Sequence, residues 1–119
     1  MTRTFCCRIH IDRLSFMTKK DVLETFGKMA DSWDEPVEIQ TGQENGEYVN
    51  VLIESKDPFT TWERMKWPLV ESKLPGGEFS RAMIVTLTGD NGWDDYLLLH
   101  HYDREQDLDA LPKTPDING

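Results

Sequence analysis

Apolar and polar side chains alternate strictly over the first segment of the chain. From Thr4 to Ile11, apolar side chains occupy every second position, namely Phe5, Cys7 and Ile9 before the final isoleucine. Successive side chains of a strand point to opposite faces, so a period of two is typical of a strand with one buried face. We therefore predict a half-buried strand over this segment.

The next apolar side chains recur at helical spacing. Val22 and Trp33 fall on one apolar stripe, and such a stripe is typical of a helix packed against a core. Thr18 precedes the stripe, and Asp21 follows that threonine by three positions, which is the arrangement of a capping box. We predict a helix that starts at Thr18 and is ended by Asp-Glu-Pro at positions 34–36.

A β-hairpin is predicted from strands at 37–41 and 48–55. A two-residue Asn-Gly turn between them would place the apolar residues of the two strands on opposite faces of the sheet. A three-residue loop at 44–46, with its glycine left-handed, instead pairs Ile39 with Val51 and keeps the apolar residues on one face. We predict the three-residue loop.

A second helix is predicted after Asp57, which is a suitable N-cap, with Pro58 at the first helical position. Pro68 is expected to stop or kink this helix, because proline lacks the backbone donor that a helix needs. The remaining predicted elements are a turn at 74–77, a strand at 81–88, a hairpin loop at 90–92 and a strand at 93–102.

The predicted order of elements is β-α-β-β-α-β-β. This order resembles the ferredoxin-like superfold, a two-layer α+β sandwich in which an antiparallel sheet carries both helices on one face. The last strand would extend the sheet beside the fourth. We predict a single α+β domain over residues 1–103, followed by a polar acidic C-terminal tail over residues 104–119. A superfold does not by itself fix a function.

Length and charge exclude several classes of partner. The chain has 119 residues and a formal net charge of −9, which disfavours binding to a phosphate backbone. No apolar stretch approaches the roughly 20 residues of a membrane-spanning helix. The N-terminus shows no secretory signal, and the neighbouring Cys6 and Cys7 would point to opposite faces of a strand. We expect free thiols, a cytoplasmic location, and neither a nucleic-acid nor a membrane partner.

The negative charge is concentrated near the C-terminus. Residues 89–119 hold eight acidic and two basic residues, a net of −6. A solvated tail is one interpretation, and an acidic docking surface that steers a basic protein is the other. On the second, the chain is a non-enzymatic binding or regulatory module, for example an inhibitor or immunity-type protein. The predicted partner-binding residues are Trp93, Asp94, Asp95, Asp103 and Asp107.

The predicted sheet face without helices offers an alternative site. Its expected residues are Cys6, Arg8, His10, Tyr48, Asn50, Leu52, Glu54, Ala82, Ile84, Thr86 and Thr88. Exposed apolar residues on such a face favour a homodimer through the open face. The chain would otherwise be a small enzyme or ligand-binding domain. In that case Arg8 anchors an anion, His10 acts as acid or base, and Tyr48 or Asn50 orients the substrate.

Metal and covalent chemistry find little support in the sequence. His100 and His101 are adjacent, so on a strand they face opposite sides and cannot share one ion. Cys6 and His10 lie about 13 Å apart along a strand, too far for a nucleophile and its base. No phosphate loop, dinucleotide fingerprint or nucleophile elbow is present. We predict no metal, no cofactor and no catalytic residue.

Overall fold

The computed structural model describes residues 2–72, 76–89 and 92–111, without the side chains of residues 76 and 92–94. The strands are β1 (Arg3–His10), β2 (Val37–Gln43), β3 (Glu47–Ser55), β4 (Met83–Gly89) and β5 (Gly92–His100). The helices are α1 (Lys19–Asp31), α2 (Pro58–Lys66) and α3 (Gly76–Ser80). A 3₁₀ turn spans Ile11–Arg13, and a π-helical turn spans Trp67–Glu71.

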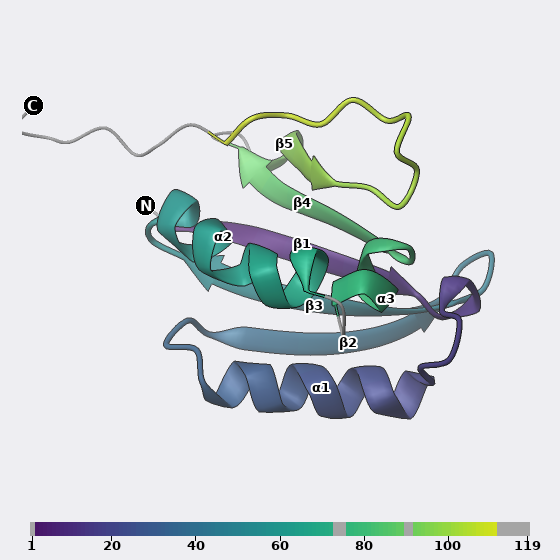
Figure 1. The fold of residues 1–119 in the computed structure, drawn as a ribbon. Helices are drawn as coiled ribbons and strands as arrows, with labels where there is room; N and C mark the ends of the chain where they lie inside the picture. The colour runs from purple at the N-terminus through teal and green to yellow at the C-terminus, as the bar shows by residue number, and fades with distance from the viewer. Residues whose placement is uncertain (1, 73–75, 90–91, 112–119) are drawn as a thin grey trace, which may run out of the picture.

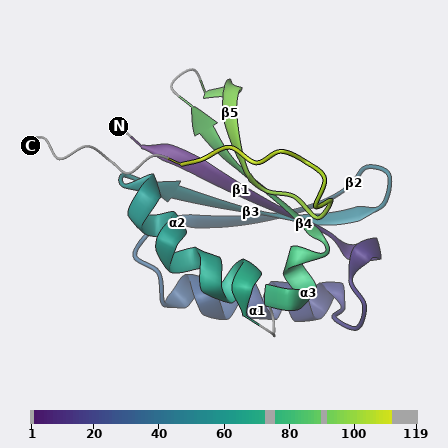
Figure 2. The same ribbon diagram turned by 45° about the horizontal axis from the view of Figure 1, so that its top comes forward.

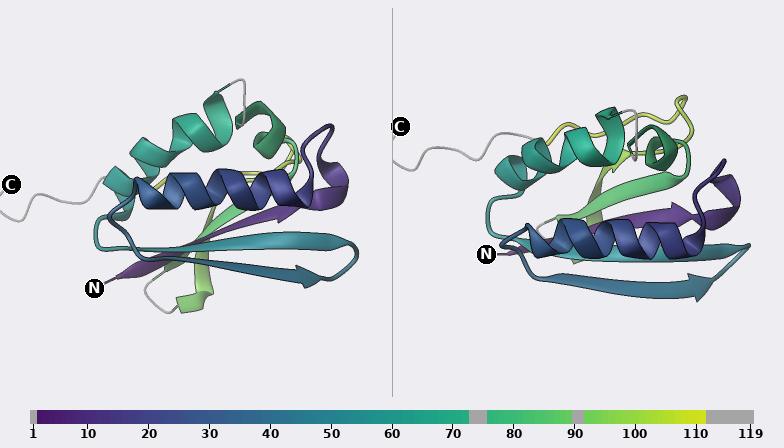
Figure 3. Two further views of the ribbon diagram at one scale, coloured as in Figure 1. Left: turned by 90° about the horizontal axis from the view of Figure 1, so that it is seen from below. Right: turned by 60° about the horizontal axis from the view of Figure 1, so that its bottom comes forward.

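The five strands form one open antiparallel sheet in the order β2-β3-β1-β4-β5 (Figure 1). The helices all lie on one face of this sheet (Figure 3). The prediction of an α+β chain with an antiparallel sheet is thus confirmed. Among the described residues, no helix lies on the opposite face of the sheet.

The core lies between the sheet and its helices. Alternate β1 residues, beginning at Phe5, are fully buried on the helical face, as the period of two predicts. From the other layer, Val22 and Phe26 of α1 and Met65 of α2 are fully buried. Since these side chains occupy the helical face, only polar and half-buried residues remain for the open face.

Within the described residues, no helix has the length and apolar character needed to cross a membrane.

Local signals place the two longer helices correctly. The Thr18 side chain accepts a hydrogen bond from the Asp21 backbone amide at 3.2 Å, and the Asp21 carboxylate accepts one from the Thr18 amide at 2.9 Å. This confirms the capping box. At α2, Asp57 is the N-cap and Pro58 the first helical residue, again as predicted.

The β2–β3 hairpin has the predicted register, with Ile39 opposite Val51. Its last pair is Gln43 with Glu47, which leaves a loop of three residues at 44–46. Both Asn45, with φ of 54°, and Gly46, with φ of 119°, lie in the left-handed region. A Cβ atom added to Gly46 would stand 2.3 Å from Oδ2 of Asp12, so this loop lies close to the 3₁₀ turn that follows β1.

Gly46→Ala is therefore expected to destabilise the protein by about 2 kcal/mol, mainly because alanine is strained at this φ; its methyl group would also require the Asp12 carboxylate to move. The matched control is Gly27→Ala, since a Cβ atom at Gly27 meets nothing within 4 Å and alanine favours a helix interior. That control should gain about 1 kcal/mol. Urea unfolding measures both changes. Equal effects of the two substitutions would contradict the described loop conformation.

One helix end differs from the prediction and one agrees with it. The α1 helix ends at Asp31, where the Ser32 amide bonds the carbonyls of Met29 and Ala30, so Trp33 packs on the core from beyond the helix. α2 ends at Lys66, two residues before Pro68, as predicted for this proline. The chain continues directly as the π-helical turn, in which Pro68 is the second residue. That turn is closed by the Ser72 amide on the Trp67 carbonyl at 2.7 Å.

The segment before β4 also differs from the prediction. Gly76 and Gly77 begin α3 instead of completing a turn, while residues 73–75 lie outside the described ranges. β4 starts at Met83. Ala82 is fully buried in the core, so its predicted place on the open face is wrong. Residues 90–91 of the predicted loop at 90–92 are likewise outside the described ranges.

A buried carboxylate ties α3 to the segment that leads into α1. Oε1 of Glu78 accepts hydrogen bonds from the backbone amides of Ser15, Phe16 and Met17 at 2.5, 2.8 and 3.2 Å. Its Oε2 accepts one from Arg81 at 2.7 Å. The Glu78 side chain is only 1% exposed. Burial alone raises the pKa of this carboxyl, but the hydrogen bonds outweigh that effect and hold its pKa below the ordinary range.

Candidate functional site

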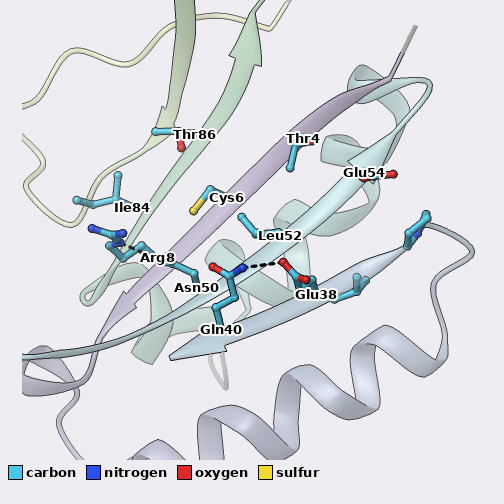
Figure 4. Close-up of a pocket in the computed structure, with 12 residues that line it drawn as sticks. Thr4, Cys6, Arg8, Glu38, Gln40, Asn50, Leu52, Glu54, Ile84 and Thr86 are labelled. Carbon is cyan, nitrogen blue, oxygen red and sulfur yellow. Dashed lines mark hydrogen bonds between the residues drawn. The ribbon is translucent and has the colours of Figure 1, made fainter. Parts of the chain in front are cut away.

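A hollow of about 730 Å³ lies on the open sheet face (Figure 4). Two rows of cross-strand neighbours from β4, β1, β3 and β2 form most of its lining: Ile84, Arg8, Asn50 and Gln40 in one row, and Thr86, Cys6, Leu52 and Glu38 in the other. Thr4, Glu54, Pro36 and Val37 complete the lining. We call this region the sheet-face hollow; its volume is in the range of small-molecule sites.

Arg8 is the ordered cation of the sheet-face hollow. Its Nε donates a hydrogen bond to Oδ1 of Asn50 at 2.9 Å, and its guanidinium carbon lies 4.1 Å from the centroid of the Tyr48 ring. Within the described ranges Arg8 forms no ion pair. A guanidinium fixed by an amide and a ring, with its charge uncompensated, is suited to bind an anionic group.

The rest of the sheet-face hollow combines two apolar side chains with carboxylates at its rim. Leu52 and Ile84 are half-buried, whereas Glu38 and Glu54 are exposed. Nε2 of Gln40 donates to Oε2 of Glu38 at 2.7 Å, which directs that rim carboxylate toward its own strand (Figure 4). The hollow therefore offers apolar contact beside a single guanidinium.

The thiol in this hollow is a poor nucleophile. Burial raises the pKa of Cys6, although Arg8 acts in the opposite direction. Burial also raises the pKa of Cys7, on the core side. Neither thiol is the thiolate that nucleophilic chemistry needs at neutral pH. Both cysteines are free.

A second hollow, of about 450 Å³, adjoins the first at Arg8. Its lining comes from the end of β1, the following turn, the β2–β3 loop and the segment after β5: Arg8, His10, Asp12, Arg13, Glu44, Asn45, Glu47 and Tyr102. We call this region the strand-end hollow. The four residues predicted for an open-face site therefore lie close together, but they belong to two adjoining hollows. Asn50 lines the first hollow, His10 the second, Arg8 both, and Tyr48 lies against Arg8.

Sequence reasoning did not assign a role to Arg13 or Tyr102, which stand next to each other here. The Arg13 guanidinium carbon lies 3.7 Å from the Tyr102 ring centroid, and the Tyr102 ring stands edge-on to His10 at 5.5 Å between centroids. The two residues are far apart in the sequence and belong to no motif. They meet because β1 and β5 run in the same direction, so the segments after these two strands begin at the same edge of the sheet.

The acidic candidates lie along β5 and the segment after it. Asp95, Asp103 and Asp107 are exposed, while the side chains of Trp93 and Asp94 lie outside the described part. We call Asp95, Asp103, Glu105, Asp107 and Asp109 the acidic edge. Residues 101–111 return beside β5 (Figure 2), where the Asp109 amide donates to the Leu98 carbonyl at 2.8 Å and the Leu98 amide donates to Oδ2 of Asp109 at 2.7 Å.

Comparison with protein-family models, with curated proteins and with solved structures gives no match for this chain. A functional conclusion therefore depends on the two hollows and the acidic edge.

The neighbouring histidines have separate surroundings. Nε2 of His100 lies 2.9 Å from the Ser80 carbonyl, which makes that nitrogen the donor, and Nδ1 of His101 accepts from the Asp103 amide at 2.9 Å. Within the described residues, no group of three potential metal ligands comes together.

Proposed function

We propose that this chain is a non-enzymatic binding module whose sheet-face hollow receives a small organic ligand with an apolar body and one anionic group. The observation that carries the proposal is the ordered Arg8, held by Asn50 and Tyr48 without an ion pair among the described residues. It stands beside Leu52 and Ile84, on the face opposite the described helices.

Both parts of the hollow contribute to the proposed specificity. The half-buried Leu52 and Ile84 supply apolar area, which favours a ligand that removes its own apolar surface from water. Arg8 supplies a positive charge and directional donors, and charge-assisted hydrogen bonds of this kind are stronger than neutral ones. The exposed Glu38 and Glu54 at the rim disfavour a ligand with several negative charges.

Octanoate is a suitable probe, with octylammonium and acetate as controls. We expect octanoate to shift the methyl resonances of Ile84 and Leu52 in a saturable NMR titration below its micelle-forming concentration. Octylammonium lacks the charge that Arg8 binds, and acetate lacks the apolar chain, so both should shift these methyl groups far less. Equal effects of octanoate and octylammonium would reject the role of the guanidinium.

A second candidate function is docking of a basic protein on the acidic edge. It is favoured because Asp109 anchors residues 101–111 beside β5, so exposed carboxylates are held at defined places. Co-purification from the native host should then recover a basic partner, with affinity that falls steeply as salt rises. A salt-insensitive partner, or one that is not basic, would reject this candidate. An inhibitor or immunity-type protein would use such a surface.

The finer fold and its setting are also proposals. The order β2-β3-β1-β4 with α1 and α2 on one face supports a ferredoxin-like sandwich, to which α3 and β5 are additions. The free thiols of Cys6 and Cys7 support a reducing, cytoplasmic setting.

A homodimer through the open face would occupy the sheet-face hollow. Sizing chromatography of the wild type and Leu52→Glu tests it, since a dimer should dissociate on substitution.

A further inference from the structure

The strand-end hollow holds charges of both signs. Arg8 and Arg13 each lie on an aromatic ring, at 4.1 Å from Tyr48 and 3.7 Å from Tyr102. Aromatic stacking of this kind fixes the plane of a guanidinium without neutralising it. The positive charges of this hollow are therefore ordered before any ligand arrives.

Negative charge faces the same space. Glu47, one of the three acids in the lining, is paired with Lys19 at 3.3 Å. Asp12 and Glu44 form no ion pair within the described ranges. Two guanidinium charges and two uncompensated carboxylates thus face one space. An anion with several charges is disfavoured by the carboxylates, and a simple cation by the guanidinium groups.

The hollow also contains an unmet hydrogen-bonding group. Nε2 of His10 is buried and has no partner among the described residues, a rare condition for a polar atom that usually marks a functional or strained position. Burial lowers the pKa of His10, and the neighbouring Arg8, Arg13 and His101 lower it further against the opposing effect of Asp12. The imidazole is therefore neutral at pH 7 and can donate to or accept from a ligand without adding a charge.

We propose that the strand-end hollow is a separate binding site for a small zwitterion that carries a carboxylate and an ammonium group, the chemistry of a free amino acid. The carboxylate lies against Arg8 and Arg13 and bonds the imidazole of His10. The ammonium group lies against Asp12 and Glu44. Because His10 Nε2 is shielded from solvent, binding requires a small shift of its neighbours, among them the Tyr102 ring that stands edge-on to the imidazole. The hollow has room for such a molecule at about 450 Å³.

Glycine is the probe, and acetate and methylammonium are its two halves. The readout is the ring ¹⁵N spectrum of the histidines at pH 7, assigned through His10→Gln. Glycine should shift the His10 ring nitrogens in a saturable way and leave those of His100 in place. Neither half alone, nor an equimolar mixture of the halves, should do so. Acetate acting as well as glycine would reject the zwitterion, and an unmoved His10 ring would reject the site.

Arg13→Gln should weaken the glycine response about tenfold, in line with the loss of a charge-assisted hydrogen bond. The matched control is Arg104→Gln, because Arg104 is exposed and does not line the hollow. Equal responses of the two variants would overturn the assignment. This site does not depend on the proposed function. Octanoate is monitored at Ile84, which lines only the sheet-face hollow, so either proposal can fail while the other stands.

Discussion

Glu78→Ala is expected to lower the free energy of unfolding by about 3 kcal/mol, because it removes the acceptor for three backbone amides and for Arg81. The Glu78 carboxylate is 1% exposed, so water cannot readily take its place as the hydrogen-bond acceptor of these amides and of Arg81. Glu78→Gln keeps a carbonyl oxygen in the same place and should cost only about 1 kcal/mol. Urea denaturation at pH 7 measures both losses.

The matched control is Glu63→Ala. Glu63 pairs with Lys66 at 2.8 Å with the same spacing of three residues that separates Glu78 from Arg81, but it lies at the surface. Exposed pairs are worth little, so this control should cost less than about 1 kcal/mol. If Glu78→Ala and Glu63→Ala destabilise equally, the proposed link between α3 and the segment before α1 is wrong.

The same carboxylate predicts a pH dependence. The pKa of Glu78 lies below its ordinary value of 4.5 in the folded chain, so the unfolded chain binds this proton more readily. Its contribution to stability is therefore fully present above pH 4.5 and is lost as the pH falls through the lower, folded pKa. Glu78→Gln should flatten the loss of stability at acid pH. An unchanged pH profile in this variant would contradict the lowered pKa.

Arg8→Gln is expected to weaken octanoate binding about tenfold or more, because the guanidinium is the cation of the sheet-face hollow. Arg13→Gln is the matched control. Arg13 is also stacked on a tyrosine ring, yet it lines only the strand-end hollow. Octanoate affinity should stay within about twofold in that control. Arg13 is exposed and does not line the sheet-face hollow, so salt screens its charge from a ligand bound there. NMR titration monitored at Ile84 gives both affinities.

A loss of octanoate affinity that is equal in Arg8→Gln and Arg13→Gln would mean that only overall charge matters. Unfolding of the Arg8→Gln variant would also lower octanoate affinity. A melting temperature close to that of the wild type excludes this explanation. Arg8→Lys provides a further distinction, because lysine keeps the charge but cannot reproduce a planar guanidinium bonded to Asn50 and stacked on Tyr48. It should restore only part of the affinity.

Local patterns in the sequence specify much of this fold. The period of two in β1, the capping box at Thr18 and the Asp57-Pro58 start of α2 each depend on residues close in sequence. The hairpin register followed from a single requirement, that the apolar residues of β2 and β3 share one face. The same parity correctly grouped Arg8, Tyr48 and Asn50 on the open face.

Other features depend on contacts between distant segments. α3 is a helix of five residues that begins with two glycines, and its Glu78 stabilises amides that lie more than sixty positions earlier. No local sequence pattern predicts a contact between segments so far apart. The stack of Arg13 on Tyr102 has the same origin, because it requires β1 and β5 to end at the same edge of the sheet. The strand-end hollow was therefore beyond sequence reasoning, although His10 was singled out.

The most direct test of the proposed function is a measurement of intermolecular NOEs between octanoate and the methyl groups of the protein. The sheet-face hollow predicts NOEs from the terminal half of the octanoate chain to Leu52 and Ile84, which line it. Val22 and Met65 are fully buried on the helical side and should show none. NOEs to the helical side, or NOEs to Ile84 that are unaltered in Arg8→Gln at the same octanoate concentration, would contradict the proposal.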